Sequence, residues 1–139
     1  MKHDPVRLAD TQGWLVRAAK DLRAAEHGLT ASPPLLEDVV FHCQQAVEKA
    51  FMGFLTWHDI PFRRTHSLEE IGRQCVKIDH ALKEPVDQAI PLSEYAWKFR
   101  YPGEAEEPTP EEAEEALTTS REVYDAVLAS LPVEALPTV

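Results

Sequence analysis

Apolar residues recur along this chain at intervals of three and four residues, which is the period of an α-helix with one buried face. No segment shows sustained alternation of apolar and polar residues, so we expect no β-sheet. The pattern predicts helices over residues 11–28, 34–58, 68–79, 81–100 and 110–130. We therefore predict an all-α fold, an antiparallel helical bundle of about five helices. Four of these form an up-down core, and the fourth helix is kinked.

Start and stop signals divide the periodic segments from one another. Gly28 marks the end of the first helix. A serine before two prolines, at residues 32–34, is typical of a helix cap followed by proline in the first turn. Residues 67–70 and 109–112 each fit a capping box, in which a Ser or Thr is followed three residues later by Glu. The second, third and fifth helices thus each have a predicted start.

The segment 34–58 is the longest and most apolar of the predicted helices, so we expect it at the centre of the bundle. So apolar a helix in a small domain predicts a hydrophobic face left uncovered, which a second copy would bury. We therefore predict a homodimer. Pro85 and Pro91 lie inside the segment 81–100, where proline removes a backbone donor, and we expect breaks there.

The chain has 139 residues, of which 44% are hydrophobic. This length fits a single domain over residues 1–139, with a core over about 10–131. No apolar run is long enough for a membrane helix, and the first residues lack the apolar stretch of a secretory signal, so we expect no membrane contact. Cys43 and Cys75 fall in apolar helical patterns, which predicts buried free thiols and a cytoplasmic protein.

The formal net charge of −10 is unevenly distributed. Residues 101–139 hold ten acidic residues and a single basic one, Arg121, whereas residues 1–100 are nearly neutral. Such a balance argues against binding of nucleic acid over the whole surface, since phosphates must be met by cations. It leaves room for a small basic cleft on the near-neutral part. The acidic helix is either a solvated face or a docking surface for a basic partner.

Most standard motifs of enzyme chemistry are absent. The chain has no glycine-rich phosphate loop, no Cys-x-x-Cys, no His-Glu-x-x-His and no Gly-x-Ser-x-Gly. No two of the six histidines are three or four residues apart, so no helical metal pair is predicted. We expect neither a metal nor a cofactor.

Three stretches carry candidate chemistry. In residues 41–50, the polar residues His42, Gln45, Glu48 and Lys49 line one flank of an apolar helix, either hydrogen-bonded to other helices or facing solvent. Residues 65–68 combine a helix cap with His66. In residues 95–103, Arg100 follows several aromatic residues. A guanidinium there either caps the helix end or forms an anion site, since its rigid fork matches a phosphate.

Taken in order, four groups of residues resemble the HEPN domain, named for "higher eukaryotes and prokaryotes nucleotide-binding". The resemblance covers about residues 10–130. It rests on Trp14, Ala18, Asp21, Leu22 and Ala25, on Phe-His-Cys-Gln-Gln-Ala-Val-Glu-Lys-Ala at 41–50, on Thr-His-Ser-Leu at 65–68, and on Arg-Tyr-Pro at 100–102.

The resemblance implies a small antiparallel helical bundle, commonly a homodimer with a cleft between the protomers. Many such proteins are bacterial and are encoded beside a minimal nucleotidyltransferase, with which they form toxin–antitoxin-like pairs. Others are metal-independent ribonucleases.

The sequence departs from the ribonuclease branch at one point. That branch has an arginine followed, after four to six residues, by a histidine. The matching arginine is Arg100, and residues 105–107 are Ala, Glu and Glu, so the histidine is missing. Arg73 and His80 have the motif spacing but fall on the wrong helix. A base for RNA cleavage would have to come from His42 or His66 through space.

We therefore predict a non-catalytic HEPN-like protein that binds a nucleotide or RNA phosphate, a nucleotidyltransferase partner, or both. Arg100 is the main candidate for the phosphate contact, with His66, Lys49 and His42 as further candidates. Tyr101 would stack on a base. One alternative is a divergent metal-independent ribonuclease toxin in which Arg100 is catalytic. A second alternative is a helical scaffold without a ligand.

Overall fold

The computed structural model describes residues 4–103 and 106–137. Within this part of the chain the regular elements are all helical, which confirms the all-α prediction. The α-helices are α1 (Pro5–Thr30), α2 (Leu36–Trp57), α3 (Leu68–Ile78), α4 (Lys83–Ala89) and α5 (Pro110–Ala129). Short 3-10 helices add η1 (His80–Leu82), η2 (Ile90–Ala96) and η3 (Val133–Ala135).

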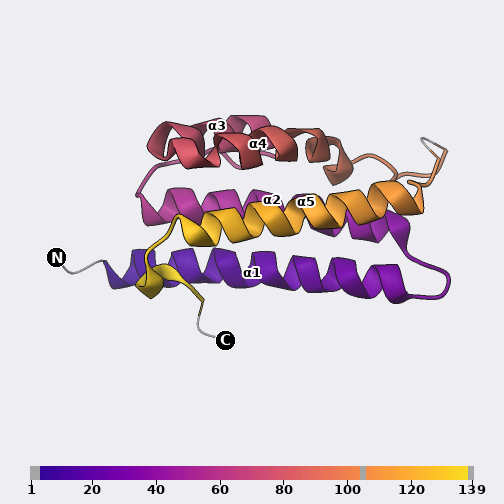
Figure 1. Ribbon diagram of the computed structural model, residues 1–139, viewed down its shortest axis with the longest axis horizontal. Coiled ribbons are helices and arrows are strands. Elements are labelled where there is room, and N and C mark those ends of the chain that lie inside the picture. The colour runs from indigo at the N-terminus through magenta and orange to yellow at the C-terminus, as the bar shows by residue number, and fades with distance from the viewer. Residues whose placement is uncertain (1–3, 104–105, 138–139) are drawn as a thin grey trace.

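The helices form an up-down bundle with α2 at its centre. Figure 1 shows α1, α2 and α5 running side by side along the long axis, with α3 and α4 as a shorter layer above them. Helix α2 contacts α1, α3, α5 and η2. Its large side chains Phe51, Phe54 and Leu55 are fully buried together with Leu15 of α1 and Ile71 of α3. The central position predicted for the most apolar helix is therefore confirmed.

The apolar face of α2 is covered within a single chain. Its buried residues run from Leu36 to Trp57 and include Val39, Val40 and Val47, all without solvent exposure. The uncovered face from which we predicted a homodimer is therefore absent from α2. The homodimer stays a prediction, now without that support.

Helix α1 begins earlier than predicted. Its N-cap is Asp4, whose carboxylate accepts a hydrogen bond from the backbone N–H of Val6 at 2.9 Å, and Pro5 occupies the first turn. A side-chain oxygen at the N-cap and a proline directly after it are the ordinary start signals of a helix. The apolar period begins only later, which is why the pattern alone put the start at residue 11.

The predicted cap of α2 at Ser32 is wrong. The helix begins at Leu36, and its N-cap residue, Leu35, makes no side-chain capping bond. Instead the backbone N–H of Leu35 donates to the carbonyl oxygen of Gly28 at 2.9 Å. The loop is therefore tied to the end of α1, and the two prolines before Leu35 lie outside the helix.

The fourth predicted helix is divided into η1, α4 and η2 in succession. The break expected at Pro91 is confirmed, since Pro91 lies in the first turn of η2, whereas the break expected at Pro85 is wrong, because α4 continues through this residue in its first turn, where a proline is tolerated. The capping box of α5 is complete, because Thr109 and Glu112 exchange side-chain to backbone hydrogen bonds of 3.1 and 2.9 Å. Cys43 and Cys75 are buried free thiols, also as predicted. Ile78 follows the apolar spacing of α3 but is exposed at the end of the helix.

Candidate functional site

A row of polar side chains follows one flank of α2, and we call His42, Gln45, Glu48 and Lys49 the polar flank. On one side of the flank lies α1, which contributes Asp21. On the other side lie the connector between α2 and α3, which contributes His66, and the segment after η2, which contributes Arg100. The interhelical alternative considered from the sequence is therefore the one that the structure adopts for His42 and Lys49, whereas Glu48 is bonded to the connector and to its own helix.

Asp21 is the centre of the first group. Its Oδ1 lies 2.8 Å from His42 Nδ1, and its Oδ2 accepts a 2.6 Å hydrogen bond from Lys49 Nζ. Asp21 is only 7% exposed, so its carboxylate depends on these two partners for neutralisation. A carboxylate on Nδ1 fixes the imidazole and leaves Nε2 as the nitrogen free for other chemistry. His42 itself is partly exposed.

Glu48 is the centre of the second group. Its Oε1 lies 2.8 Å from His66 Nδ1 and accepts a 3.1 Å hydrogen bond from Gln44 Nε2. The amide of Gln44 also reaches the carbonyl oxygen of His66 at 3.3 Å and accepts from Gln45 Nε2 at 2.7 Å. These bonds attach the connector to α2 and set the position of His66.

A pocket of about 270 Å³ opens beside this second group, between α1, α2 and the connector. Trp14, Met52, Thr65 and Arg64 line it together with Glu48 and His66. The indole of Trp14 also packs edge-on against Phe62, with ring centroids 6.3 Å apart. The pocket therefore has an aromatic wall, a sulfur-bearing side chain and charged groups of both signs.

Arg100 lies over the N-terminal part of α2. Its Cζ is 4.0 Å from the centre of the Phe41 ring, and its Nη1 is 3.6 Å from Asp38 Oδ1. The preceding Phe99 has a φ of 70°, an uncommon value for a non-glycine residue, where the backbone turns after η2. The Arg100 side chain caps no helix carbonyl within the described residues. Tyr101, directly after it, is 63% exposed.

The structure brings some of the sequence-predicted site residues together and separates others. His42 and Lys49 share Asp21, and both Arg100 and His42 contact the ring of Phe41, the latter with ring centroids 5.5 Å apart. His66 instead is fixed to α2 at Glu48, roughly 10 Å along the helix axis from Phe41. His66 therefore belongs to the pocket rather than to the Arg100 surface.

Comparison with known proteins agrees with this architecture. The HEPN domain model matches residues 11–130. The chain belongs to the HEPN domain family. A similar curated protein is "Putative toxin MJ1304" of Methanocaldococcus jannaschii, which is 33% identical over 85% of this chain and 91% of its own length. No solved structure matches the chain.

The HEPN ribonuclease motif has no counterpart near Arg100. Glu106 and Glu107 are exposed acidic residues, and position 105 lies outside the described residues. Arg73, the arginine that has the motif spacing to His80, lies away from this surface, because it donates a 2.8 Å hydrogen bond to Asp87 between α3 and α4. Among the histidines that the structure describes, His42 shares a contact with Arg100, because both meet the Phe41 ring.

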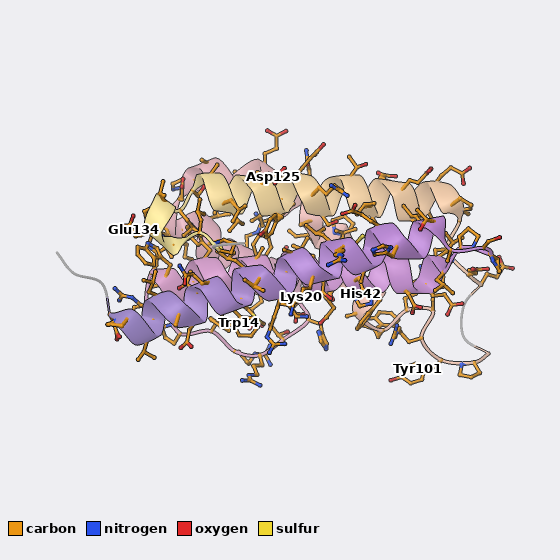
Figure 2. All side chains as sticks on the ribbon, turned by 90° about the horizontal axis from the view of Figure 1, so that it is seen from below. Trp14, Lys20, His42, Tyr101, Asp125 and Glu134 are labelled. Carbon is orange, nitrogen blue, oxygen red and sulfur yellow. The ribbon has the colours of Figure 1, made fainter. Side chains whose placement is uncertain are left out.

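Some cations near the polar flank have no carboxylate partner. Figure 2 shows Trp14, Lys20, His42 and Tyr101 along one side of α1 and Asp125 of α5 on the opposite side. In the described part of the chain, Lys20 and the pocket residue Arg64 form no ion pair. Both are therefore available to a negatively charged ligand, although the whole chain is acidic.

Three further observations concern the thiols, metal ligands and membrane helices. Burial raises the pKa of the Cys43 thiol to about 11 and also raises the pKa of Cys75, so neither is a reactive nucleophile. Among residues 4–103 and 106–137, no group of three His, Cys, Asp or Glu side chains is placed to hold a metal ion. In the same residues, no helix is long and apolar enough to cross a bilayer.

The sequence prediction did not count Asp21 and Glu48 among the phosphate-contact residues, although Asp21 belongs to the residues that resemble the HEPN domain and Glu48 to the polar stretch 41–50. Both are carboxylates at positions where the helical period calls for apolar residues, since Asp21 lies between Ala18 and Ala25 and Glu48 precedes Phe51 by three. A charged residue at such a position needs a buried partner. That signal could have marked both residues, but not their partners.

Proposed function

We propose that this HEPN protein binds an RNA or nucleotide phosphate at Arg100 and acts as the toxin-like member of a pair with a nucleotidyltransferase. The phosphate site is inferred from the contacts of the Arg100 guanidinium. Its Cζ lies over the Phe41 ring, and it forms an ion pair with Asp38 at 3.6 Å, which is too long for a hydrogen bond; within the described residues the side chain makes no hydrogen bond. Its N–H groups therefore remain available for the two oxygens of a phosphate.

The surroundings of Arg100 support this assignment. Tyr101 and Trp97 are exposed aromatic side chains on the same short segment, and unpaired bases stack on such rings. Lys20 on the same side of α1 adds unpaired positive charge. Lys49 and His42 are weaker candidates than the sequence suggested, since both are engaged with Asp21.

Binding of labelled single-stranded RNA, followed by fluorescence anisotropy in EDTA, tests the phosphate site. Loss of charge-assisted hydrogen bonds in Arg100→Ala should weaken binding roughly tenfold or more. Arg73→Ala is the matched control, because Arg73 of α3 is a comparably exposed arginine that forms an ion pair with Asp87 of α4. Equal affinities of wild type and Arg100→Ala would refute the site, and no binding by either would favour a scaffold without a ligand.

The toxin-like role is supported by family membership and by the name of the relative from Methanocaldococcus jannaschii. Expression of the chain alone should arrest growth, and co-expression of a nucleotidyltransferase encoded beside it should restore growth. The two proteins should also co-purify. Unimpaired growth together with no co-purification would refute this part of the proposal.

A ribonuclease is the second candidate function, and the pair His42–Asp21 is the observation that favours it. His42 Nε2 would accept the proton of a ribose 2′-hydroxyl as the 2′-oxygen attacks phosphorus. The 5′-oxygen would leave with a proton from water, which gives a 2′,3′-cyclic phosphate, and Arg100 would hold the phosphate. Cleavage in EDTA that is lost in both His42→Gln and Arg100→Ala would establish this activity, and intact RNA would exclude it.

A further inference from the structure

We propose that the pocket between Trp14 and the connector binds a nucleobase that carries an exocyclic amino group. The pocket is separate from the Arg100 surface, so the inference goes beyond the phosphate site. It rests on the proposed function only in that RNA is one of two sources of such a base, a free nucleotide being the other.

The first observation is an unused carboxylate oxygen. Both hydrogen bonds to Glu48, from His66 and from Gln44, end on Oε1. Oε2 accepts none from the described residues. Arg7 Nε is the one side-chain N or O atom in that part of the chain that is sealed from solvent without a partner, so Oε2 is not sealed, and Glu48 is one of the residues that line the pocket. Glu48 is only 7% exposed, and a buried carboxylate oxygen of this kind favours an N–H donor.

The second observation is the shape and lining of the pocket. Trp14 provides an indole wall, and Met52 adds an apolar, polarisable contact. At about 270 Å³, the pocket is smaller than the range for drug-sized ligands, so it suits a single planar ring system. Stacking on an aromatic side chain is how proteins hold single bases.

The third observation is the placement of charge at the pocket mouth. Arg64 is exposed, lines the pocket and forms no ion pair within the described residues. A phosphate on the ligand would meet this guanidinium while the base lies against Trp14. The carboxylate of Glu48 then selects among bases, because the amino group of cytosine or adenine donates a hydrogen bond and the carbonyl of uracil or hypoxanthine does not.

Calorimetric titration with CMP and UMP tests the inference, since these nucleotides differ at the amino position. CMP should bind roughly tenfold more tightly than UMP, and AMP more tightly than IMP. Glu48→Gln should abolish or invert this ratio, because the amide of glutamine can donate to a carbonyl oxygen. Equal affinity for CMP and UMP in the wild type, or no binding of either at millimolar concentration, would overturn the inference.

Variants at the pocket are compared with a variant at an exposed apolar residue elsewhere. Arg64→Ala, on the surface, should bring the affinity for CMP down to that for cytidine. Trp14→Leu, at a half-buried indole, should weaken CMP binding roughly tenfold, whereas Val133→Ala, which shortens an exposed apolar side chain in η3, should leave it unchanged. Equal losses in Trp14→Leu and Val133→Ala would refute the pocket assignment.

Short RNAs of cytidine and of uridine distinguish the two sources. A preference for the cytidine RNA that is lost in Trp14→Leu assigns the base of bound RNA to the pocket, whereas CMP binding without such a preference assigns a free nucleotide. If RNA binds and depends on Arg100 while CMP does not bind, the pocket inference fails and the proposed function stands. If CMP binds and Arg100→Ala leaves RNA affinity unchanged, the phosphate site fails and the pocket stands.

Discussion

Replacement of Asp21 by alanine should destabilise the protein more than any exposed acidic substitution. The carboxylate is 7% exposed and accepts from both His42 and Lys49, at 2.8 and 2.6 Å. Without it, the ammonium of Lys49 is left half-buried with no counter-charge, and the link between α1 and α2 is lost.

The size of the effect follows from the exposure of the partners. Breaking a fully buried ion pair costs about 3–5 kcal/mol, and a hydrogen bond to a charged group contributes about 1.5–3 kcal/mol. The side chains of Lys49 and His42 are 22% and 32% exposed, so water compensates part of the loss. We expect a loss of about 2–3 kcal/mol in the free energy of unfolding, and a Tm lower by about 6–10 °C for a domain of this size.

Urea unfolding followed by circular dichroism measures this loss directly. Asp125→Ala, which removes an exposed carboxylate from α5, is the control and should stay within about 0.5 kcal/mol of the wild type. The double variant Asp21→Leu with Lys49→Met should recover most of the stability, because no buried charge is then left unpaired. An Asp21→Ala variant as stable as the control, with an unchanged m-value, would refute the reasoning.

Three further predictions concern packing, thiol reactivity and capping. In Gly72→Ala, the new Cβ would lie 2.7 Å from Val86 Cγ1, and overpacking should outweigh the gain in helix propensity to leave a net loss of about 1 kcal/mol; a higher urea midpoint would contradict this. Because burial raises the pKa of Cys43 to about 11 and raises that of Cys75, neither thiol should react with a disulfide reagent at pH 8 faster than the protein unfolds; rapid reaction of one thiol would show that it is accessible. Thr109→Ala removes the side-chain cap of α5 and should cost about 1 kcal/mol, and no change in the unfolding free energy would mean that α5 does not need it.

The bundle could be predicted from the sequence because the helical period is strong where helices pack against one another. The prediction was least accurate where packing is weak. The first turns of α1 are mostly exposed, so their start at Pro5 is marked by capping residues and not by apolar spacing. The two prolines before Leu35 match the sequence signal of a helix start. The backbone N–H of Leu35 is instead bonded to the carbonyl oxygen of Gly28, and α2 begins only after this residue.

The sequence predicted several residues of the candidate site, but not which residues pair with one another. His42, Lys49, His66 and Arg100 all lie in the three stretches that carry candidate chemistry. Which carboxylate each one meets depends on the axial register of α1 against α2 and on the path of the connector. Neither can be read from the spacing within one helix, so the partners of Asp21 and Glu48 became visible only in three dimensions.

The position of Asp21, His42 and Lys49 within one helical hairpin has a consequence for the order of folding. All three lie in α1 and α2, which are consecutive in the chain and joined by a short loop, so their pairing requires only local loop closure. During synthesis this hairpin leaves the ribosome before α5, which closes the bundle last when the hydroxyl of Tyr124 reaches the carbonyl oxygen of Leu15. The Asp21–Lys49 pair can therefore align α1 against α2 in the nascent chain before α5 packs on the remaining side of α2.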